Sequence, residues 1–388
     1  MRILGMISGT SHDGIDVAVV DIDADGERLD AGIIRHGSYP YDQKLRRRLV
    51  ASLPPSSTTL DEVAQLDTLI GQAFADAAAT TLSEVGEVDL IVSHGQTVYH
   101  WVEGTAVHGT LQIGQPAWVA ERTGTAVLSD VRSRDISAGG QGAPLASTLD
   151  ALLLNGRDVP AGALNLGGIS NLTAVAEVGV RAWDIGPANA LIDAVVSDRA
   201  LHPLGYDAGG SIAASGTVDQ DLLELLLAEP YYAASPPKTT GKELFHLQYV
   251  HEAVNRYGKG MDDADLVATL TFLTVRTVAD AVMGHSLREL FVSGGGAHNC
   301  AMMNGLREQC PGVEVSDTSA LGVGADEKEA ALMALLGWLS WHGVGGVIPS
   351  ATGARAARIL GSLTPGERPL QLPEPGVPPT SLRFRTEG

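Results

Sequence analysis

The stretch MISGTSHDGIDVAVV at residues 6–20 decides the fold that this sequence predicts. The apolar residues of Arg2–Ser8 suit a strand, the turn-rich SGTSHDG interrupts them, and residues 15–22 resume as a buried strand. The pattern returns near residue 160, with a strand at Ala161–Leu166, a glycine turn, and a strand at residues 172–178. Because the two copies agree in pattern rather than in identity, the sequence predicts a duplicated architecture.

Length and charge narrow the class of protein. The chain has 388 residues, with 46 Asp and Glu against 26 Lys and Arg, and a formal net charge of −20. This length favours two large domains. The acidic balance argues against a nucleic-acid or anionic-membrane partner, since either would need a basic face. Hydrophobic residues at 44% and charged residues at 19% are ordinary for a globular protein.

The N-terminus and the cysteines bear on location. MRILGMISGTSHDG lacks the features of a signal peptide, and no run reaches the ~18 consecutive apolar residues that span a membrane. We therefore expect a soluble, cytoplasmic protein. Cys300 and Cys310 are too few for a disulfide framework or a thiolate metal site, and we interpret them as buried, unreactive thiols.

The remaining pattern divides the chain into 1–160, 161–362 and 363–388. In the first part, a strand at residues 88–93 is expected to end at a polar loop, HGQTVYH, and residues 130–145 are expected to form a glycine-rich functional loop. The second part carries mainly helices, the last at residues 326–341. The prolines between Pro365 and Pro379 predict an extended or disordered tail.

Three segments place glycines directly after an apolar strand: SGTSHDG, NLGGISN and SGGGAHN. Glycine lets the backbone approach closely, so that consecutive N–H groups can point at phosphate oxygens. Each loop alone could be a plain turn, but three of them favour the phosphate sites of actin-like kinases and ATPases. Asp13, Asp16 and Asp184 are the candidate carboxylates for Mg²⁺ or for the acceptor. Asp13 could instead bond its own turn, and Asp184 could cap the helix that follows.

Nine segments in order resemble one family closely: GMISGTSHDGID, SHGQTVYH, LQIGQPA, DVRSRDISAGGQGAPL, LNLGGISNLT, WDIGPANALID, PKTTGKELFH, FVSGGGAHN and ADEKEAALMA. The family is that of the anhydro-N-acetylmuramic acid kinases of bacterial cell-wall recycling. The resemblance implies an α/β fold of two actin-like (ribonuclease H-like) domains with an ATP cleft between them. It also implies a reaction of ATP, water and 1,6-anhydro-N-acetylmuramic acid that gives N-acetylmuramic acid 6-phosphate and ADP.

The resemblance also assigns roles to residues. Asp184 falls at the family's catalytic aspartate, where it would take a proton from the water that attacks C1. Mg²⁺ is expected at Asp13 and Asp16. The sugar is expected at Gln96, Arg132, Asp135 and Gln141, with Arg132 on the lactyl carboxylate or, alternatively, in a surface salt bridge. ATP is expected at Gly9, Thr10, Ser11, His12, Asp13, Gly14, Ile15, Asp16, Gly167, Gly168, Gly294, Gly295 and Gly296.

Two departures from the family pattern stand beside Asp184: Ile185 replaces the usual Thr and Ala188 the usual Gly. The loss of the Thr hydroxyl puts any hydrogen bond at residue 185 in doubt. Two other functions stay open from the residues, an actin-like kinase for an ordinary open hexosamine and a nucleotide-switched interaction ATPase. A homodimer is what the family suggests.

Overall fold

The computed structural model of the chain describes residues 1–9, 11–103, 106–177, 179–236, 238–241 and 244–385. The chain folds into two compact units: unit 1 is Met1–Leu153 with Glu327–Gly388, and unit 2 is Leu154–Asp326.

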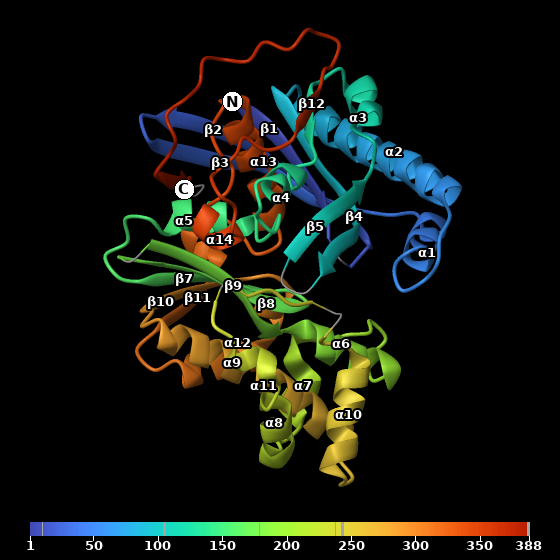
Figure 1. Ribbon diagram of the computed structural model, residues 1–388, viewed down its shortest axis with the longest axis vertical. Coiled ribbons are helices and arrows are strands. Elements are labelled where there is room, and N and C mark those ends of the chain that lie inside the picture. The colour runs from blue at the N-terminus through green and yellow to red at the C-terminus, as the bar shows by residue number, and fades with distance from the viewer. Residues whose placement is uncertain (10, 104–105, 178, 237, 242–243, 386–388) are drawn as a thin grey trace. The chain divides into compact units, whose positions relative to one another are not determined.

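Unit 1 is built on a sheet with the strand order β12-β6-β4-β1-β2-β3-β13, and β5 pairs with β4. Strands β1, β2 and β3 form an antiparallel meander, whereas β4 runs parallel to β1 and β6 runs parallel to β4. Figure 1 shows α13 among the strands of the N-terminal region, against β1 and β2. The elements are β1 (Arg2–Ser8), β2 (Gly14–Asp25), β3 (Arg28–Pro40), α1 (Gln43–Ala51), α2 (Leu60–Val85), β4 (Leu90–Glu103), β5 (Ala106–Ile113), α3 (Pro116–Thr123), β6 (Val127–Ser129), α4 (Ser133–Ser137), α5 (Ala146–Leu154), α13 (Lys328–Trp341), α14 (Pro349–Thr352), β12 (Ser362–Thr364) and β13 (Ser381–Phe384).

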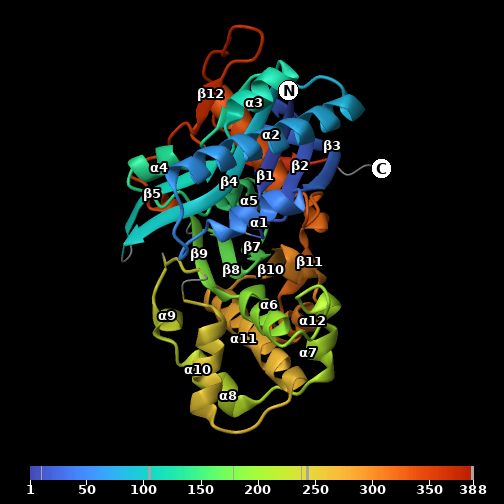
Figure 2. The same cartoon turned by 90° about the vertical axis from the view of Figure 1, so that its right-hand side faces the viewer.

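Unit 2 is built on a sheet with the strand order β11-β10-β7-β8-β9. Strands β7, β8 and β9 form an antiparallel meander, and β10 and β11 follow in parallel with β7. Figure 2 shows α6, α11 and α12 on one side of this sheet. The elements are β7 (Ala161–Leu166), β8 (Ile169–Ala176), β9 (Gly179–Pro187), α6 (Asn189–Asp198), η1 (Ala208–Gly210), α7 (Ser211–Ser215), α8 (Gln220–Leu227), α9 (Pro230–Ala233), α10 (Leu247–Tyr257), α11 (Asp263–Gly284), β10 (Glu289–Ser293), η2 (Gly295–His298), α12 (Cys300–Gln309), β11 (Glu314–Asp317) and η3 (Thr318–Leu321).

The two sheets repeat one topology. Read across the sheet, the order β3-β2-β1-β4-β6 in unit 1 matches β9-β8-β7-β10-β11 in unit 2, with the same antiparallel and parallel neighbours. This repeat confirms the predicted duplication, and the fold is α/β with two actin-like domains. In each unit a predicted glycine loop joins the first two strands of the meander: SGTSHDG joins β1 to β2, and NLGGISN joins β7 to β8.

The domain boundary differs from the one that the sequence suggested. The sequence pattern places residues 327–362 in the second domain, but α13 packs in unit 1, because almost its whole surface is apolar and buried against β1, β2 and β4. The proline-rich tail is not simply extended, since β12 pairs with β6 and β13 pairs with β3.

Other local expectations also change. The segment HGQTVYH is not a loop but part of β4, which continues to Glu103 and pairs with β5. A short helix, α4, lies within the expected 130–145 loop. Cys310 is buried as expected, but Cys300 is exposed at the start of α12, and both cysteines are free.

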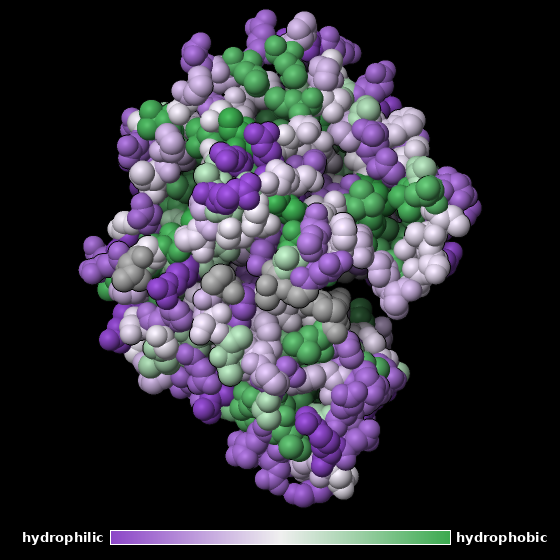
Figure 3. All heavy atoms as spheres, in the orientation of Figure 1, coloured by the Kyte–Doolittle hydropathy of each residue, from purple (hydrophilic) through white to green (hydrophobic). Residues whose placement is uncertain are grey.

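Each unit has its own hydrophobic core. In unit 2 the core gathers around α11, which is also the one helix in the described residues that is long and apolar enough to cross a membrane. Most of its apolar window (72%) is buried inside the protein, as in a core helix. On the face drawn in Figure 3, hydrophobic residues form small patches among hydrophilic ones.

Candidate active site

The first glycine loop joins β1 to β2 in unit 1. A Cβ added to Gly14 would lie 2.6 Å from the backbone oxygen of Tyr39, so Gly14 is needed for β2 and β3 to pair. A Cβ on Gly9 would meet nothing closer than Ser11 Oγ at 3.8 Å and would project into open space. Of the two glycines, Gly9 is therefore the one whose backbone a ligand could approach. Thr10 lies outside the described residues.

Gln96 braces this loop from β4. Its side chain is fully buried, and its Nε2 donates to the carbonyl oxygen of Gly9 at 3.1 Å. The hydroxyl of Ser8 lies 2.7 Å from both Gln96 Oε1 and the carbonyl oxygen of Gly14. Because its polar atoms are used in this way, Gln96 holds the loop in shape, which differs from the sugar contact that we predicted for it.

Carboxylates stand on and beside the first loop. Asp13 is exposed and accepts a hydrogen bond from Ser11 Oγ at 2.6 Å, while Asp16 lies half-buried on β2. Glu329, at the start of α13, reaches solvent, although protein surrounds it closely. These surroundings and the charge of Asp16 raise the pKa of Glu329, against the opposing influence of Arg132. The charges of Asp16 and Arg132 therefore act on Glu329 in opposite directions.

Arg132 is held by a buried histidine. Its Nε donates to His94 Nε2 at 2.9 Å, and its Nη1 donates to the carbonyl oxygen of Gly142 at 2.6 Å. Burial, together with the charge of Arg132, lowers the pKa of His94 to about 3, and burial lowers the pKa of Arg132 to about 10. His94 is thus neutral, with its proton on Nδ1 facing the carbonyl oxygen of Gly95 at 3.0 Å. Arg132 stays cationic at neutral pH, and these two bonds leave other guanidinium N–H groups for a ligand.

Asp135 shapes the GGQGAP loop instead of facing a ligand. It is fully buried, and its oxygens accept from the backbone N–H of Gly142 at 2.7 Å and from Thr352 Oγ1 at 2.9 Å. A Cβ on Gly140 would lie 2.3 Å from Asp135 Oδ2, which explains the glycine there. We therefore replace the predicted sugar contact of Asp135 with a positioning role. Gln141 is half-buried on this loop, where its backbone N–H donates to the carbonyl oxygen of Thr352 at 2.9 Å.

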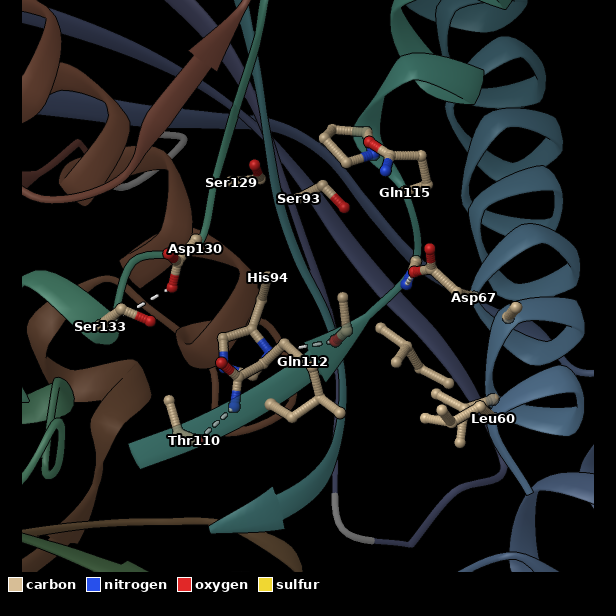
Figure 4. A pocket seen from close by; sticks show the side chains of 17 residues that line it. Leu60, Asp67, Ser93, His94, Thr110, Gln112, Gln115, Ser129, Asp130 and Ser133 are labelled. Carbon is tan, nitrogen blue, oxygen red and sulfur yellow. Dashed lines mark hydrogen bonds between the residues drawn. The ribbon is translucent and has the colours of Figure 1, made fainter. Parts of the chain in front are cut away.

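A pocket of about 490 Å³ opens in unit 1 between β4, β5 and α2 (Figure 4). At its wall the hydroxyl of Ser93 is buried, and within the described residues it has no hydrogen-bond partner. Polar groups and apolar side chains alternate around it, a lining suited to a small polar ligand. The lining residues are Leu60, Val63, Ala64, Asp67, Ser93, His94, Gly95, Thr110, Leu111, Gln112, Ile113, Gly114, Gln115, Pro116, Ser129, Asp130 and Ser133.

The second glycine loop, at Gly167 and Gly168 in unit 2, is fixed by the start of α6. The backbone N–H groups of Ala188 and Ala190 donate to the carbonyl oxygen of Gly168 at 2.9 and 3.0 Å. Asn189 donates to the carbonyl oxygen of Gly167 through its backbone N–H at 3.0 Å and through Nδ2 at 2.9 Å. The carbonyl side of this loop is therefore occupied inside the unit.

The third glycine loop packs against the second. Gly294 has φ +80°, and a Cβ there would lie 2.5 Å from Asn165 Oδ1. A Cβ on Gly296 would lie 2.6 Å from Leu166 Cβ, whereas Gly295 faces open space, with Asn189 Nδ2 at 3.9 Å. Gly294 and Gly296 are thus required for packing, and Gly295 is the accessible one.

A pocket of about 400 Å³ lies beside Gly295 in unit 2. Glycine backbone forms part of it, and Ile192 and Tyr206 add an apolar and an aromatic wall, a lining that suits a planar base. The sequence predicted only the loop at Gly295, because the other residues come from separate segments. The lining residues are Asn189, Ile192, Asp193, Tyr206, Asp207, Ala208, Gly209, Gly295, His298 and Asn299.

Asp184 lies half-buried on β9 of unit 2. Its Oδ2 accepts from Thr239 Oγ1 at 2.7 Å and from the backbone N–H of Thr240 at 3.0 Å. It does not cap the next helix, because α6 begins after Ala188 and has no side-chain cap. A carboxylate fixed on a strand in this way can accept a proton from a bound molecule.

The residue directly after Asp184 forms a β-bulge in β9. Asn171 of β8 pairs with Asp184, and Ser170 pairs with Gly186, so Ile185 is the extra residue. Ile185 is buried in the core of unit 2. A hydroxyl at residue 185 would face that core, so Ile185 in place of Thr does not remove a group from beside the Asp184 carboxylate.

The comparisons with known proteins agree. A family model described as Anhydro-N-acetylmuramic acid kinase matches residues 1–366 of the chain. The chain belongs to the anhydro-N-acetylmuramic acid kinase family. A curated relative of that name from Rhodococcus erythropolis is 51% identical over 380 residues, which cover 95% of this chain and 96% of the relative. Another from Streptomyces coelicolor is 50% identical over 387 residues, which cover 99% of each.

As a member of the anhydro-N-acetylmuramic acid kinase family, the chain is an enzyme, and the family predicted from the sequence is confirmed. One solved structure, the activator of the 2-hydroxyisocaproyl-CoA dehydratase from Clostridium difficile with bound ADPNP, is 11% identical and has a TM-score of 0.42. The match covers 86% of this chain and 93% of that structure's chain.

The predicted residues of this kinase fall into two groups. Unit 1 brings the first loop together with Arg132 and its neighbours, and unit 2 brings the second and third loops together with Asp184. Two partners of these residues were missed by sequence reasoning. Both stand in quoted motifs, His94 in SHGQTVYH and Thr239 in PKTTGKELFH, but His94 has no metal-like spacing, and nothing local to Thr239 shows that it reaches Asp184.

Proposed function

We propose that this chain uses ATP and water to open 1,6-anhydro-N-acetylmuramic acid and to phosphorylate its O6, giving N-acetylmuramic acid 6-phosphate and ADP. The observation that carries the proposal is Asp184, a half-buried carboxylate that two hydrogen bonds orient from one side. Family membership over residues 1–366 supports the same reaction.

The chemistry begins at the anomeric carbon. Asp184 takes a proton from a water molecule as the water oxygen bonds to C1, and the C1–O6 bond breaks. O6 leaves with the electron pair of that bond and attacks the γ-phosphorus of ATP, which releases ADP. The proton stays on Asp184 until it passes to solvent. Because the two displacements share O6, water, sugar and ATP must be bound together.

The phosphates of ATP are proposed to meet backbone N–H groups of the glycine loops. Gly9 and Gly295 support this, because each faces open space where a Cβ would otherwise stand. In the second loop the carbonyl oxygens are already bonded to α6, which leaves its N–H groups for an anion. The pocket beside Gly295 is proposed for the adenine ring.

Mg²⁺ is proposed at the first loop, held by Asp16 with Asp13. The donor set fits, because burial and then the charge of Asp16 raise the pKa of Glu329, and a divalent cation beside Asp16 would offset that charge. When bound, the ion would neutralise part of the negative charge on the phosphates of ATP. In the described residues, no group of three or more His, Cys, Asp or Glu gathers as a metal cage.

The sugar is proposed to contact unit 1 through Arg132 and Gln141. Arg132 is cationic and keeps unused N–H groups, which suit the lactyl carboxylate. The pocket lined by Ser93 offers a buried hydroxyl for a polar substituent. A cytoplasmic location, consistent with ATP as substrate, and a homodimer are also proposed, the latter to be checked by light scattering.

The test is a panel of sugars offered to the purified full chain with ATP and Mg²⁺. We expect phosphate transfer to 1,6-anhydro-N-acetylmuramic acid and much slower transfer to N-acetylmuramic acid and N-acetylglucosamine, measured by mass spectrometry. Preference for an open hexosamine, or release of inorganic phosphate with no sugar product, would support the other two functions instead.

A further inference from the structure

The catalytic aspartate is surrounded by a segment that bonds to it at four points. We call residues 230–240 the bracing segment; Pro237 within it lies outside the described residues. The segment contacts the backbone of Asp184 on both sides: Tyr231 Oη donates to its carbonyl oxygen at 2.7 Å, and its N–H donates to the carbonyl oxygen of Lys238 at 3.0 Å. Thr239 Oγ1 and the Thr240 N–H then reach the carboxylate itself, both at Oδ2.

Hydrogen bonds from Lys238 close the bracing segment into a loop. Lys238 Nζ donates to the carbonyl oxygens of Tyr231 at 3.0 Å and Tyr232 at 3.2 Å, and it lies 4.5 Å from the ring centroid of Tyr231. Burial lowers the pKa of Lys238. An ammonium bonded in this way joins the two ends of the segment, so Lys238 acts inside the protein rather than toward a ligand.

Aromatic residues pack this loop against the hydrophobic core of unit 2. Tyr232 stacks on Phe245 with ring centroids 5.8 Å apart, and Tyr231 meets the same ring edge-on at 6.0 Å. A Cβ on Gly186 would lie 2.7 Å from Tyr232 Cε1, so the glycine after the β-bulge admits this ring. The segment is therefore attached to the core on one side and to Asp184 on the other.

We propose that the bracing segment is a positioning device for the general base, in which Thr239 and Thr240 hold Oδ2 of Asp184 so that the carboxylate is presented to water in one orientation. The proposal rests on the function proposed above for Asp184. Both donors bond Oδ2 of Asp184, and hydrogen bonds to the charged form of a carboxyl group favour that form. Thr239 thereby orients the base, while it does not touch the reacting atoms.

Thr239 is exposed, so its substitution leaves the core of unit 2 intact. Thr239→Val keeps the shape and removes the donor, and Thr239→Ser keeps the donor and removes the methyl group. We expect Thr239→Val to lower kcat about 10-fold or more, as loss of a hydrogen bond to a charged group would. We expect the KM for ATP to stay within about 2-fold, since kcat alone reports a group that matters in the transition state.

The pH profile separates positioning from packing. Activity requires ionised Asp184, so it falls on the acidic side, and removal of a donor to the carboxylate raises its pKa and moves that acidic limb to higher pH. We expect this shift in Thr239→Val and its absence in Thr239→Ser, with kcat restored near wild type. Unchanged kcat and profile in Thr239→Val, or equal losses in both variants, would overturn the proposal.

Asp184→Asn, measured beside them, keeps the two proposals distinguishable. If Asp184→Asn is inactive while Thr239→Val behaves like wild type, the base stands and its positioning by Thr239 is refuted. If Asp184→Asn keeps nearly full activity, the function proposed for Asp184 fails, and the positioning proposal falls with it.

Discussion

The same layer of the two meanders carries its carboxylate on different strands. In unit 1, Ile7 of β1 pairs with Asp16 of β2, which pairs with Ser38 of β3. In unit 2, Asn165 of β7 pairs with Asn171 of β8, which pairs with Asp184 of β9. The carboxylate thus lies on the second strand of the meander in unit 1 and on the third strand in unit 2, although the strand order is the same.

This shift suggests how a duplicated scaffold divides its work. Asp16 stands directly after the first glycine loop, beside Glu329 and Arg132, where charge must be balanced. Asp184 stands one strand away from its loop and is held by donors from another segment, as suits the proton transfer proposed for it. The strand order therefore fixes where the loops lie, whereas the strand that carries the carboxylate decides the chemistry that we propose for each unit.

The largest effect is expected at the unit 2 carboxylate. Asp184→Asn should leave the fold intact and lower kcat about 10³-fold, because an amide cannot accept the proton of water. Steady-state kinetics with 1,6-anhydro-N-acetylmuramic acid measure the loss, and circular dichroism checks the fold. Turnover within a few-fold of wild type would refute the assignment.

The matching change in unit 1 should behave differently. Asp16→Asn should lower activity about 100-fold at low Mg²⁺, and part of the loss should return when Mg²⁺ is raised, because the variant binds the ion more weakly. Asp184→Asn should show no such recovery. A Mg²⁺ titration of both variants gives the contrast, and identical curves would remove the proposed division between the units.

The loops themselves can be tested with a matched pair of glycines. Gly9→Val should raise the KM for ATP more than about 10-fold, because the new side chain fills space that phosphate would occupy. Gly260→Val is the control, since Gly260 also faces open space but stands apart from the loops. Gly14→Val is unsuitable, because its Cβ would strike the backbone of Tyr39. Calorimetry that finds equal ATP affinity in Gly9→Val and Gly260→Val would contradict the role of the loop.

The smallest effect concerns the stability of unit 1 and its buried His94. The folded pKa of about 3 lies below the ordinary value of 6.5, so the unfolded chain binds the extra proton first as pH falls. The contribution of His94 is therefore intact above pH 6.5 and is lost progressively between 6.5 and 3. Between pH 6.5 and 5 this amounts to about 1.5 kcal/mol. Urea unfolding should show that His94→Gln, which keeps an acceptor for Arg132, has the flatter pH dependence; equal slopes would contradict the neutral, buried state.

The sequence predicted those features of the molecule that depend on short local patterns. The glycine loops, the carboxylates and the duplication all follow from short segments, because a turn between two strands shows its glycines wherever it occurs. The family followed from the order of nine such segments.

What sequence reasoning missed depends on contacts between distant segments. Gln96 and Asp135 are polar residues in polar motifs, and only the tertiary fold shows that they are buried and bonded to Gly9 and Thr352. The assignment of α13 to unit 1 and the pairing of β13 with β3 are likewise long-range events. Thr239 next to Asp184 belongs to the same class, since 55 residues separate them in the chain.

The coupled mechanism is tested by measuring where the oxygen atom of water appears in the product. The reaction is run in ¹⁸O-water with 1,6-anhydro-N-acetylmuramic acid and ATP, and the product is fragmented by mass spectrometry at early times, before the anomeric hydroxyl exchanges with solvent. If Asp184 activates water to open the ring, one ¹⁸O appears at C1 and none in the bridge between O6 and phosphorus. An unlabelled C1 hydroxyl at early times, or label found only in inorganic phosphate, would contradict the coupled mechanism.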